Sequence, residues 1–251
     1  MGYTVIGLVP LAFVCEFLDS TLGMGYGTTL TPLLLLIGFE PMQIIPAVLL
    51  SEFVTGLNAA GFHHSVRNAN FSPGTTDSKV AAVLSSFAVV GTVAAVVLAI
   101  KLPGHILKLW IGGIVLAMGV IILVTMNSTP RFSWPRLMTV GAVASFNKGM
   151  SGGGYGPLVM GGQMLSGIGV RNAVGITSLS EGVTCLVGVV LYFFLRPAAD
   201  WAIAPWIMAG AVLSVPFAAH TLKRVRETYL KIATGVLIIG LGVLTLVKAL
   251  L

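Results

Sequence analysis

Ionisable side chains stand next to runs of glycine in the middle of apolar stretches of this sequence. Asp19 precedes "GMGYG" at residues 23–27, and Lys148 precedes "GGGYG" at residues 152–156. A charged residue at the centre of a membrane helix costs about 2.5 to 3.5 kcal/mol, so its presence points to a function. Lys148 can pair with an anionic substrate, or it can form a structural ion pair with Asp19, Glu16 or another buried carboxylate.

The glycine runs allow the backbone to turn sharply within the membrane, because glycine has no Cβ. Non-helical backbone at that depth must face protein or water, since an unpaired amide in lipid costs several kcal/mol. The helical arm after each run presents free N–H groups and the positive end of its dipole, which suits an anion. The other interpretation of these glycines is close helix packing. The expected substrate-binding residues are Gly23, Gly25, Tyr26, Gly27, Thr28, Lys148, Ser151, Gly152, Gly154, Tyr155 and Gly156.

Two carboxylates occupy equivalent positions in similar segments, Glu52 in "SEFVTGL" and Glu181 in "SEGVTCL". Buried carboxylates that lie close together repel each other, so one of them can hold a proton. We assign Asp19, Glu52 and Glu181 to proton coupling or gating. Each glutamate can instead serve only as a hydrogen-bond partner of a broken helix. In the rival interpretation, Glu16 and these three acids bind a cation, and the protein is a cation or metal permease.

The composition predicts a protein that crosses the membrane several times. Of the 251 residues 56% are hydrophobic and only 9% are charged, whereas soluble domains are about 25% charged. The net charge of +6 comes from loops between apolar runs, so it indicates membrane topology and not nucleic-acid binding. No enzyme motif is present, and we expect no catalysis, no cofactor and no metal. Apolar runs of about 20 residues, enough to span a membrane, lie at 44–62, 80–100, 106–126, 172–195, 201–219 and 230–251.

The sequence contains an internal repeat. A shift of 129 residues aligns 23–57 with 152–186 without a gap, which indicates two copies of one unit. We expect the copies to cover residues 1–127 and 128–251 and to form one integrated membrane domain.

Each copy begins with a segment that is too long for one crossing, at residues 3–38 and 134–169. A continuous helix of this length would extend about 54 Å, whereas the apolar core of a bilayer is about 30 Å thick. Broken at its glycines, each segment forms a hairpin with two arms of about 15 to 18 residues. Whether these arms are re-entrant or short full spans stays open. Three spans follow each hairpin.

The distribution of positive charge supports the hairpins. If each broken segment crossed once, the cations would divide into six and seven, without a bias. With hairpins, one face carries nine cations and the other carries four, namely Lys101, Lys108, Arg196 and Lys248. The positive-inside rule then places both termini outside, and each copy crosses an odd number of times, so the copies are inverted. The nine are Arg67, Lys79, Arg131, Arg136, Arg171, Lys223, Arg224, Arg226 and Lys231.

These residues resemble the TauE/SafE (TSUP) family of sulfite and organosulfur anion exporters. The resemblance rests on each glycine-rich break and the apolar run after it, "TLTPLLLLIGFEP" and "PLVMGGQMLSGIGVRNAVGITSLSE", and on the doubled four-segment pattern. Tyr26 and Tyr155 depart from the family's G-x-G-G-G motif and indicate a subgroup. The resemblance implies outward transport of small sulfur oxyanions or sulfonates across the inner membrane, driven by protons or by the membrane potential.

The sequence therefore predicts an all-α polytopic membrane protein built of two inverted repeats. Its predicted function is secondary transport of a small sulfur-containing anion such as sulfite, thiosulfate or a sulfonate. The expected location is a bacterial-type inner (plasma) membrane. We expect a small anionic substrate and the lipid bilayer as partners and no nucleic acid, and we leave a homodimer open.

Overall fold

The computed structural model describes residues 6–23, 25–125, 132–164, 166–196, 200–222 and 227–250. Within these ranges the chain is helical and has no strand, which confirms the predicted all-α class. The start of the first hairpin at residue 3, the repeat boundary at residues 127 and 128, and the cations Arg131, Lys223, Arg224 and Arg226 lie outside the described residues, as does the side chain of Lys231. The helices are α2 (Leu8–Leu22), α3 (Tyr26–Leu36), α4 (Pro41–Ser65), α5 (Thr76–Lys101), α6 (Gly104–Thr125), α7 (Trp134–Ser151), α8 (Tyr155–Met164), α9 (Val170–Leu195), α10 (Ala204–Thr221) and α11 (Glu227–Leu250).

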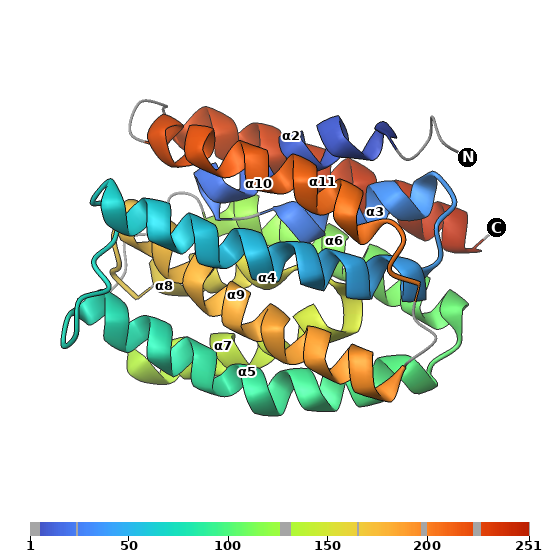
Figure 1. The fold of residues 1–251 in the computed structure, drawn as a ribbon, viewed down its shortest axis with the longest axis horizontal. Helices are drawn as coiled ribbons and strands as arrows, with labels where there is room; N and C mark the ends of the chain where they lie inside the picture. The colour runs from blue at the N-terminus through green and yellow to red at the C-terminus, as the bar shows by residue number, and fades with distance from the viewer. Residues whose placement is uncertain are drawn as a thin grey trace.

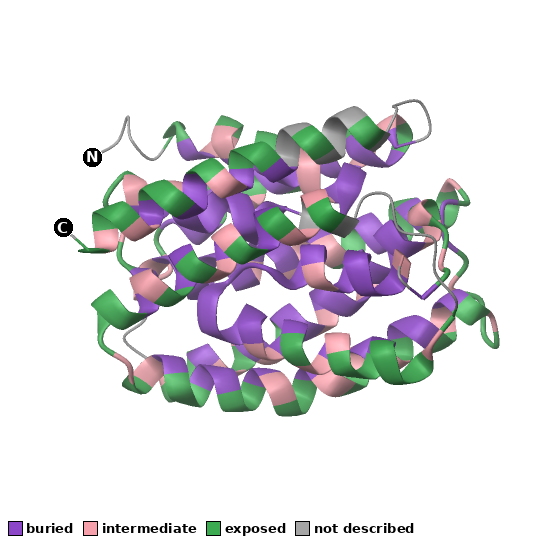
Figure 2. Ribbon diagram, turned by 180° about the vertical axis from the view of Figure 1, so that it is seen from behind, coloured by how far each residue is buried: buried purple, intermediate pink, exposed green. Residues whose placement is uncertain are grey.

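The long helices run side by side along the length of the molecule (Figure 1). Four of the six predicted spans are long and apolar enough to cross a membrane, namely those in α4, α5, α6 and α9; α10 and the described part of α11 fall short of that standard. Large apolar side chains face outward on several helices, and Val90, Phe194 and Phe217 are each more than 60% exposed. Figure 2 shows buried residues toward the interior and exposed residues on the outer faces. A lipid environment would cover these outer faces.

Both predicted breaks occur at the glycine runs. α2 ends at Gly23 (φ 66°) and α7 ends at Gly152 (φ 69°), both in the left-handed conformation that favours glycine. At the second break the N–H of Gly152 donates to the Lys148 carbonyl at 2.8 Å, and at the first the N–H of Gly23 donates to the Asp19 carbonyl. The two breaks therefore use the same helix-ending geometry.

The arms after the breaks are shorter than predicted. α3 has 11 residues and α8 has 10, whereas α2 has 15 and α7 has 18. At 1.5 Å per residue, α3 and α8 extend only about 16 Å and cannot cross an apolar core of about 30 Å. The turn at Gly38 (φ 106°) follows α3, and the turn at Gly167 (φ 77°) follows α8. The breaks lie past the middle of the predicted segments, and the turns at Gly38 and Gly167 lie within those segments, so little chain is left for the second arm.

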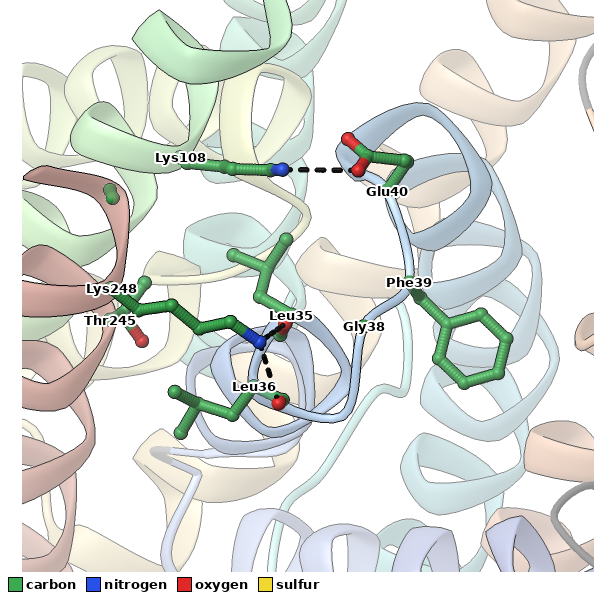
Figure 3. Close-up of a pocket in the computed structure, with 9 residues that line it drawn as sticks. Leu35, Leu36, Gly38, Phe39, Glu40, Lys108, Thr245 and Lys248 are labelled. Carbon is green, nitrogen blue, oxygen red and sulfur yellow. Dashed lines mark hydrogen bonds and ion pairs between the residues drawn. The ribbon is translucent and has the colours of Figure 1, made fainter. Parts of the chain in front are cut away.

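α3 returns to the end of the bundle where α2 begins and α11 ends (Figure 1). Figure 3 shows how this end is held: the Nζ of Lys248, near the end of α11, donates to the carbonyls of Leu35 (3.2 Å) and Leu36 (2.8 Å). These carbonyls belong to the last turn of α3, which a helix alone leaves unpaired. The first broken segment therefore begins and ends on one side of the molecule.

The helix packing pairs elements of the two halves. α4 packs against α9 and α6 against α11, so the third and the fifth helix of one half each meet their counterparts. By order in the two halves, α2 is equivalent to α7, α4 to α9 and α5 to α10. The contact of α2 with α10 is thus equivalent to the contact of α7 with α5. The contact of α4 with α10 is equivalent to the contact of α9 with α5. Two copies related by a two-fold rotation would give this pattern. The inversion of the repeats stays a prediction.

Close packing of α4 on α9 depends on Gly56. A Cβ at this position would lie 2.8 Å from the Ser178 carbonyl oxygen and 3.0 Å from the Cα of Gly182. We expect Gly56→Ala to lower the free energy of unfolding by about 1 to 3 kcal/mol, because backbone atoms cannot move aside easily. Thermal unfolding of the purified protein in detergent measures the change. Gly61→Ala on the same helix is the control, since a Cβ there meets nothing within 4 Å; equal midpoints for the two variants would contradict this account.

Candidate substrate site at the helix breaks

The two glycine runs touch each other in the interior of the molecule. The N–H of Gly154 donates to Thr28 Oγ1 at 2.8 Å, across 126 residues of sequence. A Cβ on Gly153 would lie 2.6 Å from the carbonyl oxygen of Gly27, and a Cβ on Gly27 would collide with the Gly152 carbonyl. Backbone therefore packs on backbone here, and only glycine permits that approach. The glycine runs therefore serve both purposes considered for them: they end the helices, and they allow the two breaks to pack closely.

Lys148 lies between the two equivalent glutamates. Its Nζ is 2.6 Å from Glu181 Oε1 and forms a second ion pair with Glu52 Oε2. The Lys148 side chain is 0% exposed, and those of Glu52 and Glu181 are 3% and 7% exposed. α7, α4 and α9 meet at this group. The sequence left open whether Lys148 pairs with a substrate anion or with a buried carboxylate. In this structure it pairs with the buried carboxylates of Glu52 and Glu181.

The backbone donors at the start of α3 are bonded to the protein's own carboxylates. The N–H of Gly27 donates to Glu52 Oε1 at 3.0 Å, and the N–H of Gly25 donates to Asp19 Oδ1 at 2.8 Å. Carboxylates at a helix N-terminus are stabilised by the unpaired N–H groups and by the dipole. In the structure the negative charge at this terminus belongs to Asp19 and Glu52, and the binding of a substrate anion there stays a prediction.

The second break satisfies its donors differently. Ser151 Oγ accepts from the N–H of Gly153 at 3.2 Å and donates to the Asn147 carbonyl at 2.9 Å. Asn147 Nδ2 donates to the Gly153 carbonyl at 3.0 Å. Tyr155 and Gly156 are buried in the first turn of α8. Asn147 therefore belongs to the break, although the sequence analysis did not select it.

Two hydroxyls at the breaks lack a partner. Thr29 Oγ1 and Thr31 Oγ1 are buried and make no hydrogen bond within the described part of the chain. Thr29 Oγ1 is 3.3 Å from the position of a Cβ on Gly25, and Thr31 Oγ1 is 3.5 Å from that of a Cβ on Gly152. A buried hydroxyl without a partner costs free energy unless a ligand or water satisfies it. Thr31 was missed in the sequence, where its spacing of three residues from Thr28 on one helix face is the signal.

A small cavity of about 10 Å³ lies beside the carboxylates. It is bordered by Glu16, Asp19, Glu52 and Glu181, together with small residues of α4 and α9. Glu16 accepts hydrogen bonds from Ser20 Oγ (2.6 Å) and Thr55 Oγ1 (3.2 Å). The cavity has about the room that one water molecule needs. In this conformation the site is closed around its own ion pairs.

The carboxylates also raise the question of a metal ion. One oxygen from each of Asp19, Glu52 and Glu181 lies within 4.8 Å of the others. The ammonium group of Lys148 is bound to two of these three carboxylates. A cation at this place would have to displace Lys148, because two positive charges repel strongly in a medium of low polarity.

The fold and the site together define a class of protein. The chain is a multi-pass membrane protein whose interrupted helices meet around buried charges, an arrangement that is typical of membrane transporters. The chain matches the family model "Sulfite exporter TauE/SafE" over residues 8–245. It belongs to the TauE/SafE family of membrane transporters, which confirms the resemblance noted in the sequence.

One curated relative is similar over nearly the whole chain. It is "Probable membrane transporter protein YtnM" of Bacillus subtilis (strain 168), which is 27% identical over 258 residues, covering 96% of this chain and 83% of the relative. No solved structure gives a significant match.

The ion pairs of Lys148 predict a stability effect. We expect Lys148→Met to lower the free energy of unfolding by about 3 to 5 kcal/mol, because it leaves Glu52 and Glu181 buried without a counter-charge. Unfolding of the purified protein in detergent measures this loss. Combining Lys148→Met with Glu52→Gln and Glu181→Gln should restore much of it. Lys108→Met is the control, since the exposed pair of Lys108 with Glu40 is worth at most about 1 kcal/mol; a similar loss in both lysine variants would show that burial of the charges is not the cause.

Proposed function

We propose that this chain is a secondary transporter that exports a small sulfur-containing anion, such as sulfite, thiosulfate or a sulfonate. The observation that carries the proposal is Lys148, a fully buried ammonium group at the meeting point of the two helix breaks. Such a group attracts an anion strongly, because little water screens its charge. The description of the matched family as sulfite exporters supports a sulfur oxyanion as the substrate class.

The ion pairs suggest how the anion enters the site. Glu52 accepts from the Gly27 N–H and pairs with Lys148, and a sulfur oxyanion can accept from the same two donors. We propose that the anion takes the place of Glu52, while Thr28 and Ser151 supply hydroxyl groups beside it. The displaced carboxylate would then lack a counter-charge in apolar surroundings, so it takes up a proton. In this scheme, binding of the anion is therefore coupled to protonation of Glu52.

Asp19 and Glu181 have the gating role in this scheme. Asp19 holds the N–H of Gly25 at the first break, and Glu181 holds Lys148 from α9. Exchange of these partners changes how the two breaks contact each other, which is the movement that alternating access requires. The charge bias of the loops supports an inner-membrane location with both termini outside and with residues 66–75 in the cytoplasm.

The cation permease is the second candidate, favoured by the cluster of Asp19, Glu52 and Glu181. Its weakness is the position of Lys148, whose ammonium group is already paired with two of these three carboxylates. The two candidates differ in which residue a ligand requires. An anion needs Lys148, whereas a cation needs the carboxylates.

Ligand-dependent stability distinguishes the candidates. We expect a sulfur anion from the panel of sulfite, thiosulfate, sulfate, taurine and sulfoacetate to raise the melting temperature of the purified protein. A ligand at about 100 times its Kd stabilises the folded state by about 2.7 kcal/mol. Most of the shift should be lost in Lys148→Ala. Stabilisation by sodium, nickel or magnesium that persists in Lys148→Ala and is lost in Glu52→Gln would support the cation permease instead.

A substitution at the first break tests the location of the site. Gly25 has φ −152°, which any residue adopts, and a Cβ there meets only Thr29 Oγ1. We therefore expect Gly25→Leu to fold and to abolish anion flux in proteoliposomes, because its side chain occupies the place proposed for the anion. Gly113→Leu on α6 is the control, since a Cβ at Gly113 has open space around it. Normal flux in Gly25→Leu would exclude the breaks as the substrate site.

A further inference from the structure

A second polar cavity lies at the end of the bundle where α4 ends and α9 begins. It has a volume of about 710 Å³, far more than the cavity beside the carboxylates. Its lining includes Arg67, Asn68 and Asn70 from the segment after α4, and Arg171 and Asn172 from the first turn of α9. Ala69 is the one apolar residue among those that line it. We call this cavity the arginine cleft.

The arginine cleft carries unbalanced positive charge. Arg67 and Arg171 are exposed, and neither side chain has an ion pair or hydrogen bond to another described residue. Asp77 is the carboxylate bonded to the rim, where its Oδ2 accepts from the Asn70 N–H (2.8 Å) and from Asn172 Nδ2 (2.7 Å). This carboxylate is therefore engaged in holding the two sides of the cleft together. Two guanidinium groups remain available for a ligand.

The ends of two helices meet at the cleft. Arg67 (φ 61°) has the left-handed conformation that ends α4, where the N–H groups of Arg67 and Asn68 donate to carbonyls of the last helical turn. α9 begins at the cleft, and its N-cap Gly169 provides no side chain to bond the first N–H groups. The positive end of this helix dipole adds to the field of the two arginines.

The helices that form the cleft lead to the charged site. α4 carries Glu52 and α9 carries Glu181, which lies ten residues beyond Arg171, or about 15 Å along the helix. The small cavity beside the carboxylates lies between these two helices and is bordered on them by Thr55, Ala59 and Ser178. On α4 these residues lie between Glu52 and the cleft, and on α9 Ser178 lies between the cleft and Glu181. On both helices, small residues therefore border the charged site on the side that faces the cleft.

The opposite end of the bundle has a different chemistry. A pocket of about 160 Å³ there is lined by Lys108, Lys248 and Glu40, among others (Figure 3). Lys108 is paired with Glu40 at 3.1 Å, and Lys248 is bonded to the carbonyls of Leu35 and Leu36. The cations of this pocket are thus engaged within the protein. Of these two cavities, the arginine cleft is the one whose cations lack a partner in the described part of the chain.

We propose that the arginine cleft is an entrance site for the transported oxyanion. It lies on the side of the membrane that residues 66–75 face, which is the cytoplasmic side in the proposed topology. Arg67 and Arg171 bind the oxyanion through paired N–H donors, the geometry that guanidinium groups provide. The cleft concentrates the anion at the entrance of the way to Lys148. This assignment rests on the proposed function, since it names the first site that the same substrate meets.

Anion flux in proteoliposomes tests the cleft. The double variant Arg67→Gln/Arg171→Gln should raise the apparent KM about tenfold and leave the maximal rate unchanged, because steering by local charge raises the encounter rate by about 10 to 1,000 times. The effect should shrink when the salt concentration rises from about 50 mM to about 500 mM, which shortens the screening length. Ser72→Cys, labelled with an impermeant maleimide, reports which way the protein faces, since Cys15 and Cys185 are buried.

A matched control removes the same amount of charge elsewhere. Lys79 is exposed at the same end of the bundle but does not line the cleft, and Lys101 is exposed at the other end. Lys79→Gln/Lys101→Gln should keep the wild-type KM. An equal KM in the two double variants would overturn the proposal, and so would a fall in the maximal rate at constant KM.

The lipid provides a further arm of the test. A phospholipid headgroup has the same oxyanion chemistry as the free anion, so the measurement uses vesicles of phosphatidylcholine alone and vesicles that also contain phosphatidylglycerol. The proposal requires the KM effect in phosphatidylcholine alone. An effect confined to vesicles with phosphatidylglycerol would make the cleft a lipid site and would overturn the proposal.

Binding separates this proposal from the proposed function. A wild-type protein without flux of any sulfur anion would contradict the function as a transporter. Calorimetric titration of sulfite into the protein in detergent tests the cleft independently: Lys148→Ala should retain a weak, salt-sensitive binding step that Arg67→Gln/Arg171→Gln removes. Loss of that step in Lys148→Ala, or its persistence in the arginine variant, would overturn the assignment of the cleft.

Discussion

The buried ion pairs of Lys148 with Glu52 and Glu181 are the interaction on which the rest of this structure depends. An ammonium group inside a membrane protein is tolerated only with a partner, and here the two partners come from α4 and α9, while the lysine comes from α7. The three charges therefore hold elements of both halves together at the place where the helices break. Removing Lys148 leaves two buried carboxylates without a counter-charge. In the proposed mechanism, a substrate anion replaces one of these carboxylates next to the lysine.

Glycine makes this arrangement sterically possible. The backbone of one break lies directly on that of the other, so that Thr28 of the first reaches the N–H of Gly154 in the second. The N–H groups that a helix start leaves unpaired are bonded to Asp19 and Glu52. Carboxylates of the protein thus occupy positions that suit a substrate anion, while the hydroxyls of Thr29 and Thr31 remain without partners. In the closed site, the backbone N–H groups and Lys148 are already bonded to carboxylates of the protein, so no substrate is needed to satisfy them.

The two halves share a plan but differ in charge. The shift of 129 residues that aligns the glycine runs places Asp19 on Lys148 and Glu52 on Glu181. Equivalent positions next to the two breaks thus carry opposite charges, and the lysine takes both glutamates while Asp19 turns to the backbone of its own break. The cavities at the two ends of the bundle differ as well, because Lys108 and Lys248 in one are bonded within the protein, whereas the side chains of Arg67 and Arg171 in the other have no partner among the described residues.

The sequence alone determined the membrane class, the position of both helix breaks and the presence of charge beside them. These features follow from local properties. Apolar composition indicates the class, the conformational freedom of glycine indicates the breaks, and the cost of a charge in an apolar run marks the charged residues. It did not determine the lengths of α3 and α8, which depend on later glycine turns. It also left open which acid pairs with Lys148, since Glu52 and Glu181 are far from it in the chain and only the packing of α4, α7 and α9 brings them together. Asn147, Thr31 and the arginine cleft became visible only in three dimensions. Their roles depend on neighbours that local sequence does not specify.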